Sequence, residues 1–145
     1  MLRLLNLDLT RDADPPLASV VTARFDPGTS TMSWAQAGHF APVLLRGERG
    51  RPLACPAGGL LGLRPDAGYG QATQRLRPRD VVVFFTDGVL DPADRSGSPV
   101  RSLVRSLVRE LVRAYRQSGS GDLHDRFLPS GEGEACLVTV ERAPA

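Results

Sequence analysis

The amino-acid sequence predicts an α+β fold, in which mainly antiparallel strands are covered by one long helix. Two observations carry this prediction. Short segments rich in β-branched residues recur between turn residues, whereas residues 99–116 repeat their apolar side chains every three or four positions. Strands joined by short turns favour antiparallel pairing, and a helix with one apolar face needs a sheet to cover it.

Composition indicates one ordinary globular domain over residues 1–145. The chain is 41% hydrophobic and 23% charged, and a chain of this length buries roughly two thirds of its unfolded surface. The formal net charge of +2 is too small to indicate a polyanion partner, although every basic residue is an arginine. Apolar runs are far too short to span a bilayer, and no signal peptide is visible. We therefore expect a cytoplasmic protein that binds neither nucleic acid nor membrane.

The first half of the chain predicts a short helix followed by strands. In residues 1–9, Leu2, Leu5 and Leu9 fall on one helical stripe. Residues 17–25 are rich in β-branched side chains, and Thr31–Ala37 alternates in polarity, so these two segments predict a hairpin around the turn at residues 26–29. The next segments predict a strand at Val43–Arg46, a charged loop at 48–51, a returning segment at 52–56 and strands at 71–76 and 80–85.

The second half contains the clearest helix, at residues 99–116. Ser98 is a suitable N-cap, and Pro99 suits the first helical position. The residues that follow predict a flexible loop at 118–122, an irregular segment at 124–129 and a final strand at 135–140.

Asp87 is the strongest candidate for a functional residue. The apolar run Val81–Phe85 predicts a buried strand, which would deliver the following carboxylate to the rim of a sheet. A carboxylate held there suits a hard cation such as Mg²⁺ or Mn²⁺. An Asp-Gly pair after a strand is also a common turn, so this residue alone leaves both interpretations open.

Other reactive residues favour structural roles. His39 follows a small-residue pair at a strand end and is expected to be a hydrogen-bonded structural group, and Cys55 and Cys136 are expected to be reduced thiols. One helical face carries five arginines, which favours a solvated surface over a nucleic-acid site because aromatic residues do not alternate with them in a pattern that would support base stacking. These residues are Arg101, Arg105, Arg109, Arg113 and Arg116.

Four segments together resemble a known family. They are Ala37-Gly38-His39, the glycine-rich residues 58–63, Leu76-Arg77-Pro78-Arg79-Asp80, and Val81–Phe85 running into Thr86-Asp87-Gly88. From about Leu2 to Arg142 the chain resembles the C-terminal half of the metal-dependent (PPM-type, protein phosphatase 2C-like) serine/threonine phosphatases, in the SpoIIE branch. The resemblance implies the C-terminal half of a phosphatase β-sandwich flanked by helices, so that residues 1–145 form a single partial domain.

The resemblance implies that Asp87 is a metal ligand, and that Asp91 stands where the family usually has a glutamate. It also reveals two departures. Where the family has two consecutive aspartates before the last strand, this chain has Gly133 and Glu134, so Glu134 or Glu132 is the remaining candidate ligand. The family's first Asp-Gly motif, whose carboxylate bridges two metals, would precede Met1. We therefore expect weak binding of Mn²⁺ or Mg²⁺ at Asp87 and Glu134, and we assign no catalytic residue.

Several functions remain open at this point. The resemblance implies hydrolysis of phosphoserine or phosphothreonine in a phosphorylated anti-anti-sigma-type protein. The missing ligand positions favour a pseudophosphatase that binds a regulatory protein without turnover, and a third possibility is a gene whose first half is encoded upstream. Because Val81–Phe85 needs cover on both faces, we also expect self-association or a partner at this strand and at the edge near residues 17–25.

Overall fold

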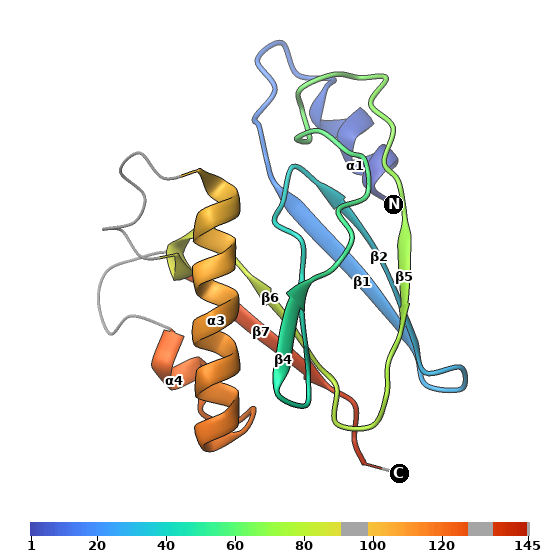
Figure 1. Ribbon diagram of the computed structural model, residues 1–145. Helices are drawn as coiled ribbons and strands as arrows, with labels where there is room; N and C mark the ends of the chain where they lie inside the picture. Colours follow the sequence, from blue (N-terminus) through green and yellow to red (C-terminus); the bar gives the residue numbers. More distant parts are fainter. Residues whose placement is uncertain (91–98, 128–134, 145) are drawn as a thin grey trace. The chain divides into compact units, whose positions relative to one another are not determined.

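The computed structural model describes residues 1–90, 99–127 and 135–144. The chain forms two compact units, each made of two segments (Figure 1). Unit 1 contains Met1–Ala41 and Ala54–Leu76, and unit 2 contains Pro42–Leu53 and the chain from Arg77 onward. Every pairing between the strands is antiparallel, which confirms the predicted α+β class.

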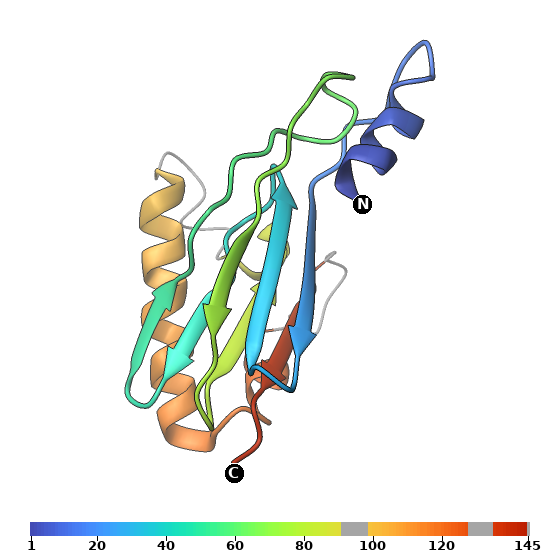
Figure 2. The same cartoon turned by 90° about the vertical axis from the view of Figure 1, so that its right-hand side faces the viewer.

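Unit 1 is a three-stranded sheet with one helix. The strands β1 (Val20–Asp26), β2 (Thr31–Ala37) and β5 (Ala72–Arg75) lie in the order β1-β2-β5, as Figure 2 shows. The predicted hairpin is confirmed, with Val20 opposite Ala37 and Asp26 opposite Thr31. The turn between β1 and β2 is closed by the Asp26 carboxylate, which accepts hydrogen bonds from two backbone N–H groups. A side-chain hydrogen bond from Thr29 has the largest effect in lowering the pKa of Asp26, and the backbone bonds from Thr29 and Gly28 lower it as well.

Helix α1 (Leu2–Leu9) is held by a polar residue as well as by leucine. Leu2 and Asn6 are buried, whereas Leu5 is 43% exposed, so the predicted stripe of Leu2, Leu5 and Leu9 is wrong at its centre. The Asn6 amide donates to the Arg64 carbonyl at 2.7 Å, and its oxygen accepts from the Gly62 N–H at 2.9 Å. These bonds to a distant loop rotate Asn6, rather than Leu5, toward the interior.

Unit 2 contains a four-stranded sheet in the order β4-β3-β6-β7. Its strands are β3 (Val43–Arg46), β4 (Arg49–Pro52), β6 (Val81–Phe85) and β7 (Leu137–Glu141). The predicted loop at 48–51 and the return at 52–56 are wrong, because Arg49 already pairs with Arg46. The turn needs only Gly47 and Glu48, since Gly47 adopts φ 55°, a left-handed conformation that glycine adopts without steric cost.

Strand β6 occupies an interior position in this sheet, with β3 on one side and β7 on the other. Val81, Val82 and Val83 have no exposed surface. The buried strand predicted from this apolar run is therefore confirmed. The expectation that Val81–Phe85 would offer an uncovered surface to a partner is wrong, because neighbouring strands and side chains already cover it.

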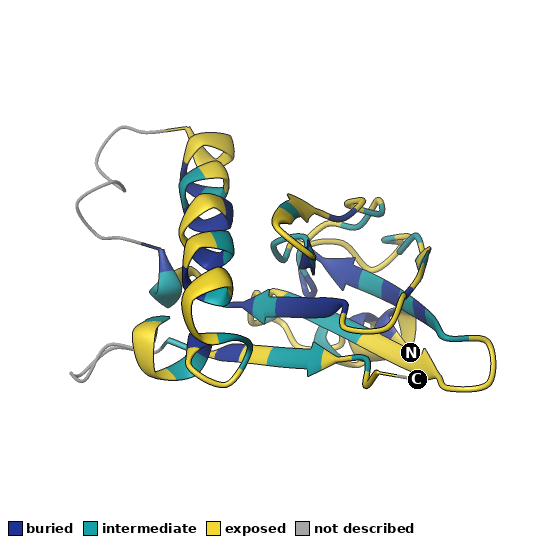
Figure 3. Cartoon of the chain, turned by 60° about the horizontal axis from the view of Figure 1, so that its bottom comes forward, coloured by how far each residue is buried: buried dark blue, intermediate teal, exposed yellow. Residues whose placement is uncertain are grey.

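Among the described residues of unit 2, two α-helices pack together. Helix α3 (Val100–Ser118) has a buried face that includes Leu103, Leu107 and Leu111, and its other face is exposed, as the dark blue and yellow parts of this helix in Figure 3 show. All five arginines of the predicted solvated face are exposed. Pro99 precedes the first helical residue instead of occupying it, and the predicted cap Ser98 lies outside the described residues.

The segment predicted to be irregular, 124–129, instead begins within a short helix, α4 (Leu123–Phe127). Leu123 has no exposed surface, and the helix contacts α3 and β7. Five residues are too few for an apolar repeat to be visible, so tertiary packing rather than local pattern specifies this helix.

The turn before β6 is built around Asp80, which is 1% exposed. Its carboxylate accepts hydrogen bonds from the Arg77 N–H at 2.7 Å and from Arg46 Nε and Nη2 at 2.9 and 2.6 Å. The hydrogen bond to Asp80 raises the pKa of Arg46. Within the turn Arg79 adopts φ 65°, and its backbone bonds to Arg142 and Tyr115 hold it there. A left-handed arginine is sterically unfavourable, so these surrounding bonds maintain it.

We predict that Leu107→Ala lowers the free energy of unfolding by about 2–5 kcal/mol, because Leu107 is 4% exposed and its removal leaves a cavity. Arg109 lies two residues later in α3, on the exposed face, and Arg109→Ala should change the free energy of unfolding by less than about 0.5 kcal/mol. Urea titration of both variants measures the difference. Equal effects would show that α3 is not a core element.

We predict that Arg79→Gly raises the free energy of unfolding by about 0.5–1 kcal/mol. Glycine removes the left-handed strain, although its freer unfolded chain offsets part of that gain. Arg77→Gly makes the same chemical change at a residue without positive φ, and should be destabilising. Thermal or urea unfolding separates them, and a loss of stability in Arg79→Gly matching that of Arg77→Gly would refute the assignment of strain.

Candidate functional site

Asp87 lies where the buried strand β6 ends. The chain leaves β6 at Thr86 and forms one turn of 3-10 helix at Asp87–Val89, in which Leu90 N–H donates to the Asp87 carbonyl at 3.0 Å. Leu90 is buried and anchors the turn, whereas Asp87 is exposed. The structure therefore presents this residue at the rim of the sheet, at the end of a fixed strand, as the sequence predicts.

Thr86 joins this turn to the segment that precedes β7. Its N–H donates to the Cys136 carbonyl at 3.0 Å, and its hydroxyl accepts from the Cys136 N–H at 2.9 Å. Cys136 is consequently held next to the residue that precedes Asp87. Glu134 precedes Cys136 by two positions in the sequence. The two hydrogen bonds between Thr86 and Cys136 therefore join the chain segments that carry the predicted ligands Asp87 and Glu134.

The other positions of the predicted metal site, Glu134, Glu132, Gly133 and Asp91, lie outside the described residues. Within the described part of the chain, no three histidine, cysteine, aspartate or glutamate side chains gather closely enough to hold a metal ion. Asp87 is the predicted ligand that the described residues include, and by themselves they do not form a three-ligand metal centre.

His39 has structural contacts, as the sequence predicts. Its Nδ1 lies 3.2 Å from the Ser19 hydroxyl, and its ring meets the edge of Phe40 with centroids 6.1 Å apart. Cys55 and Cys136 are both free and exposed, which confirms that they are not paired with each other. The Cys55 sulfur accepts a hydrogen bond from the buried Gln36 amide.

The glycines of the sequence motifs serve close packing. Gly38 adopts φ 61°, and its N–H donates to the Gly58 carbonyl at 3.2 Å. A Cβ atom at Gly38 would overlap Leu60, and one at Gly58 would overlap the Gln36 backbone. The first two motifs of the resemblance therefore contact each other and determine the shape of unit 1 rather than its chemistry.

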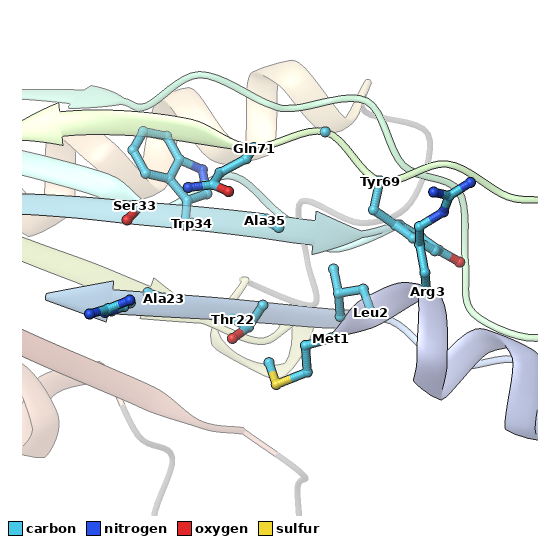
Figure 4. A pocket seen from close by; sticks show the side chains of 12 residues that line it. Met1, Leu2, Arg3, Thr22, Ala23, Ser33, Trp34, Ala35, Tyr69 and Gln71 are labelled. Carbon is cyan, nitrogen blue, oxygen red and sulfur yellow. The ribbon is translucent and has the colours of Figure 1, made fainter.

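A hollow in unit 1 was not predicted from the sequence. Figure 4 shows it between the first residues of α1 and the strands β1 and β2, with Trp34 and Tyr69 among the side chains that line it. Burial raises the pKa of Tyr69, and its hydroxyl is buried without a hydrogen-bond partner among the described residues. The lining comes from segments far apart in sequence, so local patterns could not reveal it.

None of the helices that the structure describes combines the length and the apolar character needed to span a bilayer.

Comparison with solved structures identifies the fold. The RsbU and RsbW domains of a Mycobacterium tuberculosis protein match with a TM-score of 0.69 at 20% identity, over 88% of this chain and 37% of that one. The phosphatase domain of the cell fate determinant SpoIIE from Bacillus subtilis, presoaked with Mn, matches with a TM-score of 0.63 at 10% identity, over 99% of this chain and 65% of that one. The PPM Ser-Thr phosphatase MsPP from Mycobacterium smegmatis, in complex with cacodylate, matches with a TM-score of 0.54 at 17% identity, over 97% of this chain and 70% of that one. The fold is thus that of PPM-type phosphatases.

The family model of stage II sporulation protein E (SpoIIE) matches residues 1–129, and the chain therefore belongs to this family. The resemblance found in the sequence is confirmed at this level. Comparison with curated protein sequences gives no match. The chain spans 37% and 65% of the first two structures, so it corresponds to only part of each of those chains.

Proposed function

We propose that this chain is a degenerate or partial protein serine/threonine phosphatase domain of the SpoIIE type, located in the cytoplasm. In this proposal Asp87 is a ligand for Mn²⁺ or Mg²⁺. The substrate class is phosphoserine or phosphothreonine in a small regulatory protein of the anti-anti-sigma type. The observation that carries the proposal is the position of Asp87 directly after the buried strand β6 in a member of this family.

A second ligand would come from Glu134. Supporting this, the two hydrogen bonds between Thr86 and Cys136 tie the start of β7 to the residue before Asp87. Two carboxylates form a weak site for a hard cation, with a dissociation constant on the order of 10⁻³ M. Binding of a divalent metal at this rim would then be measurable but weak.

An alternative function is that of a pseudophosphatase that binds a regulatory protein without turnover. The observation that favours it is Gly133, which provides no side-chain ligand atom where the family resemblance implies an aspartate. A two-metal hydrolytic site also requires a carboxylate that bridges both ions. We therefore expect the 145-residue chain to be inactive by itself.

The edge of β1 supports a protein partner or a second copy of this chain. Strand β1 pairs with β2 on one side, and no strand in the described ranges pairs with its other side. Its last residues are exposed, including Phe25 at 36%. An open edge of this kind can accept a strand from another chain through backbone hydrogen bonds.

We predict that Mn²⁺ binding, followed by electron paramagnetic resonance at millimolar metal, decreases in Asp87→Asn. Asp122→Asn removes another exposed carboxylate of unit 2, and it should leave binding unchanged. Hydrolysis of a phosphoserine peptide by the wild-type chain should be no faster than by Asp87→Asn, since the metal site is incomplete.

These two measurements discriminate between the functions. Equal metal binding in all three proteins would remove Asp87 from the proposal. Wild-type turnover clearly above that of Asp87→Asn would establish the phosphatase and exclude the pseudophosphatase.

We predict that the chain self-associates at micromolar concentration through the β1 edge, as measured by size-exclusion chromatography with light scattering. Phe25→Lys places a charge on this edge and should shift the population toward monomer. Leu63→Lys, at a residue 56% exposed in a loop, is the matched control and should behave as wild type. A monomeric wild-type chain, or equal effects of both lysines, would contradict the assignment of the edge.

A further inference from the structure

An arginine-lined groove lies in unit 2, away from Asp87. It has a volume of about 570 Å³ and is formed by the turn Gly47–Glu48, the turn before β6 and the end of α3. Its lining includes Arg46, Arg77, Arg79, Arg116, Glu48 and Tyr115. Three chain segments distant in sequence therefore contribute positive side chains to one concave surface.

The charges in this groove divide into two paired arginines and two unpaired ones. Arg46 is occupied by the buried Asp80 carboxylate, and Arg116 lies 3.3 Å from Glu48 in a pair whose side chains are 56% and 76% exposed. Arg77 and Arg79 are exposed, and the structure gives their guanidinium groups no hydrogen-bond or ion-pair partner among the described residues. The groove therefore has a net positive charge.

The positive surface continues along α3. Arg109 and Arg113 line an adjoining hollow that shares Arg116 with the groove. Both are exposed, and the only acidic residue of α3 is Glu110. Although the whole chain has a formal charge of only +2, arginines thus dominate this part of unit 2.

The backbone under the groove is fixed. Asp80 accepts three hydrogen bonds from Arg46 and Arg77, and the Tyr115 hydroxyl donates to the Arg79 carbonyl at 3.3 Å. The left-handed φ of Arg79 is held by this network. Non-glycine residues in such conformations are concentrated at functional sites, where the surrounding structure maintains them.

The groove is separate from the candidate metal ligand. Asp80 and Asp87 stand at opposite ends of β6, and a five-residue strand separates its ends by roughly 16 Å. A ligand in the groove would therefore contact a different region from a phosphoester bound near Asp87. The inference does not depend on the proposed function.

We propose that this groove binds an acidic segment of a partner protein through its side-chain carboxylates. A guanidinium group has a planar fork of donors that matches a carboxylate, and Arg46 already binds Asp80 in this two-point manner. Glu48 pairs with Arg116 at the surface, and an exposed ion pair of this kind stabilises the fold little. A carboxylate from another molecule can therefore take the place of Glu48 at little cost in stability. An incoming glutamate or aspartate replaces Glu48 at Arg116 and pairs with Arg77 and Arg79.

The surface favours an acidic peptide over nucleic acid. Single-stranded nucleic acid needs exposed aromatic rings on which bases stack. Tyr115 is the aromatic residue in the groove lining, and its hydroxyl is already bonded to the Arg79 carbonyl. Two arginines of the groove, Arg46 and Arg116, already pair with carboxylates, which is the chemistry that an acidic peptide offers.

The test is binding of a fluorescein-labelled octaglutamate peptide to the full chain, followed by fluorescence anisotropy at two salt concentrations. Arg79→Gly and Arg116→Gln should each weaken binding by about three- to tenfold, as loss of charge-assisted contacts does. Arg79→Gly is informative because its fold should be more stable than wild type, so weaker binding cannot be attributed to unfolding. Glu48→Gln should tighten binding, because it removes the competing carboxylate.

Arg101→Gln is the matched control. It removes one exposed positive charge from α3 about 18 Å along the helix axis from Arg113, and it should leave binding unchanged. Unchanged binding in Arg79→Gly and Arg116→Gln, or an equal loss in Arg101→Gln, would overturn the proposal in favour of general charge attraction. Tighter binding of a single-stranded oligonucleotide of equal charge than of the peptide would also overturn it.

Discussion

The ion pair between the buried Asp80 carboxylate and Arg46 is the interaction on which unit 2 depends most. A buried charge is unfavourable unless it is paired and hydrogen-bonded, and Asp80 is bonded to Arg46 at the end of β3 and to the Arg77 N–H. Its carbonyl also accepts from Arg142, just after β7. One residue therefore joins the start of β6 to both neighbouring strands, and the position of Asp87 at the far end of β6 follows from it.

Local patterns predicted the elements whose residues repeat regularly. The hairpin of β1 and β2, the buried strand β6 and the long helix α3 follow from alternation, from a continuous apolar run and from helical spacing. Local patterns did not predict elements whose structure depends on contacts with residues distant in sequence. Asn6 is buried because it bonds to the loop at Gly62 and Arg64, and α4 forms because its first residue, Leu123, is buried where the helix contacts α3 and β7. Asp87 was predictable because it follows a strand, whereas the groove was not, because its arginines come from separate segments.

Family membership and chemistry rest on different residues in this chain. A side chain at Gly38 would overlap Leu60, and one at Gly58 would overlap the Gln36 backbone, so these glycines specify the fold whatever the state of the metal site. Metal chemistry depends instead on carboxylates at the rim, where Gly133 interrupts the implied set. A chain can therefore retain the SpoIIE-type fold without retaining turnover, since function resides in sites carried by a fold.

The conformation of Arg79 links stability to binding. Glycine would meet the backbone requirement at φ 65° with less strain, so arginine at this position lowers stability without contributing a side-chain bond to the described fold. Such a residue is explained when its guanidinium group acts on something outside the chain, as an arginine in a groove with Arg77 and Arg116 can do. Because the same turn begins β6, a ligand that immobilises Arg79 would also stabilise the start of the strand that presents Asp87.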